Sequence, residues 1–209
     1  MWYWVKTPLL VKKIFPNQIW DIPSQLPFVY LTFDDGPTIG VTEKILSTLK
    51  EYNAKATFFC VGNNVQNLPN EYQKIIDHGH SVGNHTMTHP MGWGKSKKLY
   101  LKDIKKAEEL INSNLFRPPY GKINFKSNKT LQKRFKIIMW DVVGGDFDPN
   151  CSKEQLIDNI INNVEKGSII VLHDNQIVKN KTLKALPLII EGIQKKGFQL
   201  KALPFTPLR

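Results

Sequence analysis

Short apolar runs alternate with longer amphipathic stretches along most of this chain. Seven runs have the length and composition of β-strands: Val29–Phe33, Ala56–Val61, His80–Gly83, Leu115–Phe116, Phe135–Val142, Ser168–Leu172 and Phe198–Ala202. Amphipathic stretches lie between most of them: Val41–Tyr52, Glu71–Asp77, Leu101–Asn112, Lys153–Glu165 and Leu183–Lys196. Strands that alternate with helices typically pair in parallel. The pattern predicts an α/β fold whose parallel sheet is either open or closed into a barrel.

The chain has the size of one domain with a substantial core. It has 209 residues, no internal repeat and no linker rich in serine and glycine. We expect one domain over residues 29–209 and an N-terminal arm over residues 1–28 that packs on it, because Trp2, Trp4 and Trp20 need partners. An interfacial anchor made of the arm's aromatic residues and lysines is the alternative. No run has the length of a signal-peptide core or a membrane span, so the sequence predicts no particular cellular compartment. We expect a monomer.

The chain is basic, with a net charge of +11, but its lysines are spread along the sequence. No nucleic-acid-binding motif accompanies them. We therefore expect a solvated positive surface that could attract an acidic polymer, and no nucleic-acid partner. The chain has two cysteines, Cys60 in an apolar run and Cys151 in a predicted loop, and they form no recognisable disulfide framework.

Polar clusters follow five of the predicted strands at the point where each strand ends. The carboxyl ends of parallel strands share one edge of a sheet, and active sites of α/β folds are built there. We therefore expect the clusters to converge on one mouth. In chain order they are Asp34-Asp35, His85 with His89, Arg117–Gly121, Asp146-Phe147 and His173-Asp174.

The first two clusters suggest a metal site. Asp34 and Asp35 are adjacent, lie after an apolar run and repel each other, so a cation is the simplest compensation. His85 and His89 are spaced i, i+4, and on a helical turn both rings reach one ion, with a carboxylate as the third ligand. A simple turn for the aspartates and structural roles for the histidines are the alternatives. We favour one aspartate as a ligand and the other as acceptor of a proton from a water whose pKa the ion lowers.

The stretch Arg117–Gly121 predicts a rigid loop because it contains two prolines and a glycine. Arg117 is either a surface cation or the partner that holds the base carboxylate and keeps it ionised. Prolines have no N–H, so the backbone donor of this loop is Tyr120 or Gly121, and either could stabilise an oxyanion.

The last two clusters suggest a general acid. His173 ends a very apolar run, where it is either a core histidine or, beside a metal site, an acid. Asp146 could fix the tautomer of His173 and raise its pKa, and Asp174 is the alternative partner.

Taken in order, these motifs resemble the five motifs of the polysaccharide deacetylases, carbohydrate esterases with a NodB-type homology domain. The matching residues are Thr32–Pro37, His85-Thr86 with His89, Arg117–Gly121, Asp146-Phe147 and Leu172-His173. The resemblance runs from about Val29 to Ala202. It implies a distorted (β/α) barrel, usually of seven strands, which agrees with the predicted number.

The resemblance also implies a role for each motif. A divalent metal, commonly zinc with cobalt, nickel or manganese as alternatives, would be held by Asp35, His85 and His89. Asp34 would be the general base, tethered by Arg117, and His173 the general acid, oriented by Asp146. The Tyr120 N–H would share the oxyanion with the metal. The residues expected to contact substrate are Pro118, Tyr120, Phe147 and Leu172, the last of which would line a pocket for the acetyl methyl.

The family resemblance implies a metal-dependent hydrolase that removes acetyl groups from N-acetylated amino sugars in a peptidoglycan or chitin-type chain. O-acetyl ester cleavage, as on xylan, and an inactive carbohydrate-binding homologue are the alternatives; a basic nucleic-acid-binding protein is motivated by charge alone. Phe147 departs from the family pattern, which often has Trp there. It keeps an apolar wall and loses the indole N–H, which bears on sugar recognition rather than on hydrolysis.

Overall fold

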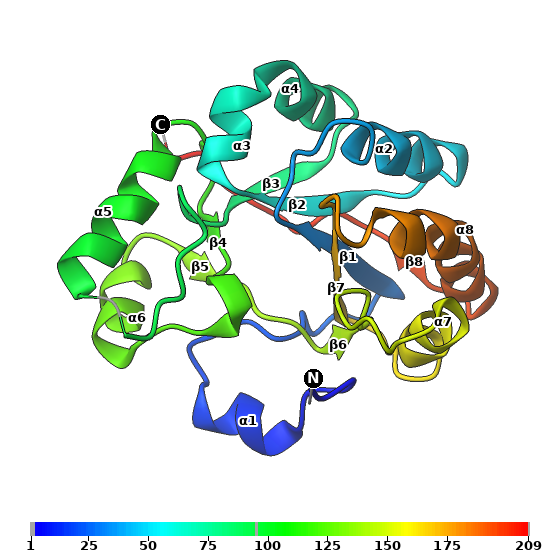
Figure 1. Cartoon of the computed structure of the whole chain (residues 1–209). Coiled ribbons are helices and arrows are strands. Elements are labelled where there is room, and N and C mark those ends of the chain that lie inside the picture. The colour runs from blue at the N-terminus through cyan, green and yellow to red at the C-terminus, as the bar shows by residue number, and fades with distance from the viewer. Residues whose placement is uncertain (1–2, 95, 209) are drawn as a thin grey trace.

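The computed structural model describes residues 3–94 and 96–208. Within them, one sheet contains eight strands, and every pairing between them is parallel. The strands are β1 (Phe28–Asp34), β2 (Ala56–Cys60), β3 (Ser81–Asn84), β4 (Leu115–Phe116), β5 (Lys136–Ile137), β6 (Val142–Val143), β7 (Ile169–His173) and β8 (Gln199–Leu200). Their order is β5-β4-β3-β2-β1-β7-β6, with β8 beside the start of β1. The sheet curls and helices ring its outer side, as predicted for a distorted (β/α) barrel (Figure 1).

One predicted strand is wrong in extent. The run Phe135–Val142 is divided into β5 and β6, which are the two ends of the sheet. Ile138 N–H still donates to Phe116 O of β4, whereas Asp141 N–H donates to Ile169 O of β7. The four residues between β5 and β6 therefore cross from one edge of the curled sheet to the other, and they cannot pair continuously with either neighbour.

β1 lies in the middle of the sheet and sets the register of the site. Asp34, its last residue, is aligned with His173 of β7 and with Phe59 of β2. Asn84, at the end of β3, is aligned with Phe116 of β4. The carboxyl ends of these strands therefore lie at one edge, as the sequence predicts.

The helices pack around the sheet: α1 (Leu9–Ile14), α2 (Thr42–Glu51), α3 (Gly62–Asn67), α4 (Pro69–Asp77), α5 (Lys97–Glu108), α6 (Phe125–Leu131), α7 (Lys153–Ile161) and α8 (Lys179–Lys195). Five of them match the amphipathic stretches of the sequence. The other three, α1, α3 and α6, have six or seven residues, too few to show a helical period. Among the described residues, no helix combines the length and apolar character that a bilayer crossing needs.

Side chains of the strands alternate between two layers of the core. On β1, Val29, Leu31 and Phe33 belong to the large cluster that the helices cover. Thr32 lies between them and Asp34 after them, and both accept hydrogen bonds from Arg117 inside the barrel. Cys60 and Cys151 are buried free thiols, and both belong to the large cluster that the helices cover.

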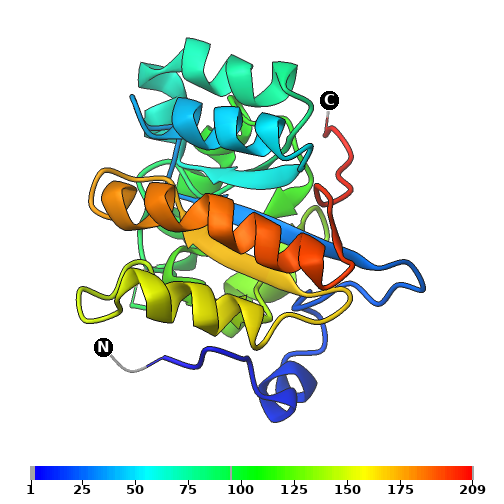
Figure 2. The ribbon, with the colours of Figure 1, turned by 90° about the vertical axis from the view of Figure 1, so that its right-hand side faces the viewer.

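The N-terminal arm runs along the barrel next to α7, between α6 and α7 (Figures 1 and 2). Val143 N–H of β6 donates to Val5 O, and Ile19 N–H donates to Ile137 O of β5, so the arm contacts both ends of the sheet. Trp20 is buried against the barrel, whereas Trp4 stays 46% exposed. Trp2 lies outside the described residues, and the boundary at residue 28 stays a prediction.

Candidate active site

Asp34 is held at the end of β1 by a buried arginine. Arg117 Nη1 donates to Asp34 Oδ1 at 2.6 Å and to Thr32 Oγ1 at 2.7 Å, and Nη2 donates to Met139 O at 2.8 Å. Arg117 is fully buried and its guanidinium lies 4.1 Å from the centre of the Phe59 ring. Burial lowers the pKa of Arg117, and the Asp34 carboxylate partly offsets this effect. Arg117 is thus a partner of Asp34 and not a surface cation.

Asp35 points away from Asp34 because its backbone is left-handed, with φ of 86°. Its Oδ1 lies 3.1 Å from His89 Nε2 and 3.6 Å from His85 Nε2. Its Oδ2 accepts a hydrogen bond from Asn175 Nδ2 at 2.8 Å. Burial alone would raise the pKa of Asp35, but the hydrogen bond from His89 and the nearby histidines hold it below its usual range. The two adjacent carboxylates therefore face different partners.

The helical turn predicted for His85 and His89 is wrong. Residues 85–90 form a loop after β3, in which Thr86 and His89 have φ of 69° and 57°. Thr86 Oγ1 accepts from His89 N–H, and Asp103 of α5 accepts from the N–H groups of Met87 and Thr88. Left-handed residues fold the loop back on itself and bring the two rings to a centroid distance of 5.0 Å. The rings meet as predicted, although no helix places them.

The three predicted ligand residues fit a divalent metal. Their ligand atoms lie within 4.8 Å of one another. Ligands bound tetrahedrally at about 2.0–2.1 Å from Zn²⁺ are about 3.3 Å apart, close to the 3.1 and 3.6 Å found between Asp35 and the two histidines. His85 Nδ1 contacts Arg117 O at 2.8 Å, so it carries the proton and leaves Nε2 as the free donor atom that faces Asp35.

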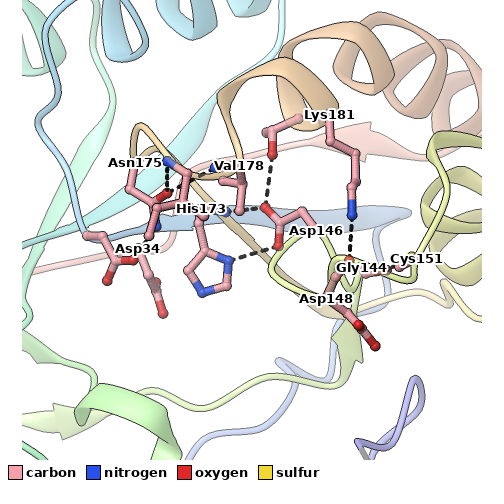
Figure 3. A network of polar contacts seen from close by, with 12 residues as sticks. Asp34, Gly144, Asp146, Asp148, Cys151, His173, Asn175, Val178 and Lys181 are labelled. Atoms are coloured by element: carbon pink, nitrogen blue, oxygen red, sulfur yellow. Dashed lines mark hydrogen bonds and ion pairs between the residues drawn. The ribbon is translucent and has the colours of Figure 1, made fainter. Parts of the chain in front are cut away.

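His173 lies between Asp34 and Asp146 (Figure 3). Its Nδ1 is 2.8 Å from Asp146 Oδ1, and its backbone N–H donates to Asp146 Oδ2 at 2.8 Å. Burial disfavours the charged ring, but the charge of Asp146 and its hydrogen bond outweigh it and raise the pKa of His173 to about 10. Of the two partners that the sequence left open, Asp146 is therefore the one that contacts His173.

Asp174, the alternative partner, holds the turn after β1 instead. Its Oδ1 accepts from Gly36 N–H at 2.7 Å, and its Oδ2 accepts from Thr42 Oγ1 at 2.7 Å. A Cβ at position 36 would lie 1.9 Å from Asp174 Oδ2, so only glycine permits this approach. Burial raises the pKa of Asp174 to about 7, and the charges of Asp35 and Asp34 act in the same direction.

The loop after β4 contains the two backbone N–H groups that were candidates for the oxyanion donor, those of Tyr120 and Gly121. Gly121 N–H donates to Pro118 O at 3.0 Å, so it is already used within the turn. Tyr120 has φ of 60°, is 58% exposed and packs edge-on against His89 with ring centroids 4.8 Å apart. Pro118, which we expected to contact substrate, is buried beneath the turn, and Tyr120 and Gly121 line the cavity in its place.

A cavity of about 500 Å³ joins these residues. Phe147 lines it and packs edge-on against His173, with ring centroids 5.6 Å apart. The prediction that Leu172 lines a pocket for the acetyl methyl is wrong. Leu172 is fully buried in the large cluster that the helices cover, where Leu172 and Leu156 of α7 both contact Gly144. Successive side chains of a strand point to opposite faces, so Val171 and His173 share the inner face of β7 and Val171 lines the cavity.

Four residues that support the site had no role predicted from the sequence. Asn175 contacts Asp35, Thr32 contacts Arg117, Thr182 Oγ1 donates to Asp146 Oδ2, and Asp103 holds the loop of the histidines. Thr32 is the first residue of the motif Thr32–Pro37 and Asn175 follows His173-Asp174, and these positions were their only signal. Asp103 lies within the predicted amphipathic stretch Leu101–Asn112 and Thr182 lies just before the stretch Leu183–Lys196, and neither position carried a functional signal.

Comparisons with known proteins agree with this geometry. The family model described as polysaccharide deacetylase matches residues 22–135. A peptidoglycan-N-acetylglucosamine deacetylase of Bacillus cereus is 31% identical over 200 residues, which cover 91% of this chain and 94% of that protein. The chain belongs to the polysaccharide deacetylase family. The predicted family is thereby confirmed.

Two further relatives extend the likeness. A chitooligosaccharide deacetylase of Rhizobium leguminosarum bv. trifolii is 30% identical over 208 residues, covering 87% of this chain and 96% of that protein. The crystal structure of a peptidoglycan N-acetylglucosamine deacetylase, in complex with 4-naphthalen-1-yl-N-oxidanyl-benzamide, superposes with a TM-score of 0.87 at 33% identity and covers 95% of both chains. The family fold therefore extends over nearly the whole chain, including most of the arm.

Proposed function

We propose that this protein is a metal-dependent hydrolase that removes acetyl groups from N-acetylated amino sugars in a polysaccharide of the peptidoglycan or chitin type. The observation that carries the proposal is the arrangement of three groups around one cavity. They are the ligand set Asp35, His85 and His89, the Asp34–Arg117 pair and the His173–Asp146 pair. Membership of the family and the names of the relatives support the same reaction.

Asp34 is the proposed general base. Arg117 occupies its Oδ1, which leaves Oδ2 to take a proton from the attacking water as the water oxygen bonds to the acetyl carbon. The buried guanidinium fixes the orientation of the carboxylate through this charge-assisted hydrogen bond. Arg117 thus acts through Asp34 and does not touch the substrate.

His173 is the proposed general acid. The tetrahedral oxyanion accepts a hydrogen bond from Tyr120 N–H, the donor that the Pro118 turn leaves for an external acceptor. When the carbon–nitrogen bond breaks, His173 Nε2 donates its proton to the leaving nitrogen, which departs as the amine while acetate remains. Asp146 holds the ring by Nδ1 and favours its charged form, so the proton is present at neutral pH.

Asp35, His85 and His89 would hold the divalent cation. When bound, such a cation supplies Lewis acidity, which polarises a carbonyl oxygen and lowers the pKa of water. A set of two imidazoles and one carboxylate suits Zn²⁺ best, and Co²⁺, Ni²⁺ and Mn²⁺ accept the same donors.

Acetate release tests the function. We expect the Zn²⁺-loaded protein to release acetate from N-acetylglucosamine oligomers or from peptidoglycan, and the Asp34→Asn variant to release none while it still binds the ion. Acetylated xylan is the comparison substrate: release from xylan alone identifies an O-acetyl esterase. Binding of the oligomers without release of acetate by the wild-type protein identifies an inactive carbohydrate-binding homologue, and either result refutes the proposal.

A further inference from the structure

The N-terminal arm is tied to the barrel at a buried carboxylate that the proposed reaction does not use. Asp141 is 2% exposed; its Oδ2 accepts from Lys6 Nζ at 2.8 Å and its Oδ1 from Lys12 Nζ at 2.7 Å. Ser168 Oγ also donates to Asp141, and Thr7 N–H donates to Asp141 O at 2.8 Å. Both charged partners come from the arm, so these contacts fix the arm against the barrel just before β6.

The first described residue of the arm reaches the wall of the active site. The ring of Tyr3 packs edge-on against Phe147 with centroids 5.1 Å apart, and Phe147 packs in the same way against His173. A Cβ at Gly145, whose φ is +91°, would lie 2.2 Å from Tyr3 Oη. The glycine thus opens the space that the Tyr3 hydroxyl fills, and the arm becomes continuous with the wall beside the proposed acid.

The next residue, Trp4, faces the same cavity as the reacting groups. The arm contributes Tyr3, Trp4, Thr7, Val11 and Trp20 to the lining of the cavity. The cavity has a volume of about 500 Å³, within the range of about 300–1,000 Å³ that is typical of ligand sites. Trp4 keeps 46% of its surface exposed, whereas Trp20 is buried. Among the described residues of the arm, Trp4 is therefore the half-exposed indole that lines the cavity, and it belongs to a segment that ion pairs hold in place.

We propose that Trp4 forms a sugar-binding subsite, against which a ring of the oligosaccharide stacks beyond the ring that loses its acetyl group. This inference rests on the proposed function. The C–H face of a pyranose is apolar and flat, and a rigid indole offers matching area with little loss of conformational entropy. The arm is then part of the substrate site, and the substrate is a chain of at least two sugars.

Exposure alone does not identify a subsite, because single apolar residues are often exposed on protein surfaces. The arm itself provides the comparison. Phe15 is 47% exposed, nearly the same as Trp4, yet it lies just after α1 and outside the residues that line the cavity. Phe15→Ala is therefore a matched control for loss of an exposed aromatic side chain from the arm.

Binding measured in the inactive Asp34→Asn parent tests the subsite without turnover. Calorimetry with Zn²⁺-loaded protein compares the N-acetylglucosamine monomer with the tetramer. We expect Trp4→Ala to weaken the tetramer about tenfold, the size of effect seen for an aromatic anchor, and to leave the monomer unchanged. Trp4→Phe recovers part of the loss, and Phe15→Ala matches the parent with both ligands.

Two results overturn the subsite. One is an equal affinity of the Trp4→Ala variant and its parent for the tetramer, and the other is an equal loss for monomer and tetramer. If the wild-type protein releases acetate in either case, the proposed function stands and only the subsite fails. If the wild-type protein releases no acetate and the parent binds neither ligand, the proposed function fails and the subsite with it.

Discussion

Replacement of Arg117 by methionine removes the cation that the structure places inside the barrel. The guanidinium of Arg117 is fully buried and donates to Asp34 Oδ1, Thr32 Oγ1 and the carbonyl groups of Ile138 and Met139. Methionine fills part of the space but offers no donor. The variant therefore leaves the Asp34 carboxylate without its partner and several buried acceptors without a hydrogen bond.

The expected cost follows from these contacts. Removing one member of a buried ion pair costs about 3–5 kcal/mol, because the remaining charge stays buried and uncompensated. For a chain of this length each kcal/mol lowers the melting temperature by about 2–4 °C, so Arg117→Met should melt about 6–20 °C below the wild type.

Urea unfolding of the two single variants and of the Arg117→Met/Asp34→Asn double variant measures the coupling. Because the double variant no longer buries an unpaired carboxylate, its loss should be smaller than the sum of the single losses by about 1–3 kcal/mol. A loss below about 1 kcal/mol for Arg117→Met, or strict additivity in the double variant, would show that the pair does not have the energetic role assigned to it.

Three further changes have defined outcomes. Asp146→Asn should lower the pKa of His173 from about 10. The wild-type pair stabilises the fold fully below pH ~6.5 and loses this effect as the pH rises through ~10, so urea unfolding should show that the variant is less stable than the wild type at pH 6 and little different at pH 10. The alkaline limb of the pH–rate profile should move to lower pH. Zn²⁺ at 100 times its Kd should stabilise the metal-free protein by about 2.7 kcal/mol in thermal unfolding, and His89→Ala should abolish the effect; an unchanged rise in the variant counts against the ligand set. Gly145→Ala should cost at least about 1 kcal/mol more than Gly40→Ala, because both have positive φ but only position 145 meets Tyr3; equal costs contradict the packing of the arm.

The fold and the centre of the site could be predicted because two strong regularities meet in this sequence. Alternating apolar and amphipathic stretches predict a parallel sheet, and the carboxyl ends of such strands lie at one edge. Asp34, His85, Arg117 and His173 each follow a predicted strand, so their convergence needs no knowledge of the loops. Leu172 could have been placed correctly too, because a period of two puts Val171 and His173 on the same face and Leu172 on the other.

The remaining features depend on contacts between segments far apart in the chain. The loop of His85 and His89 is shaped by left-handed residues and by Asp103 on α5, and no local pattern predicts either. The position of the N-terminal arm also depends on such distant contacts. The contacts of Lys6 and Lys12 with Asp141 join positions more than 120 residues apart, and spacing along the chain carries no information about them.

The central claim is that the adjacent carboxylates Asp34 and Asp35 have different tasks. The most direct test measures the zinc content and the acetate release of Asp34→Asn and Asp35→Asn side by side. We expect Asp34→Asn to hold zinc as the wild type does and to release no acetate, and Asp35→Asn to lose the zinc. Equal zinc content in the two variants, or acetate release by Asp34→Asn at the wild-type rate, would contradict the account.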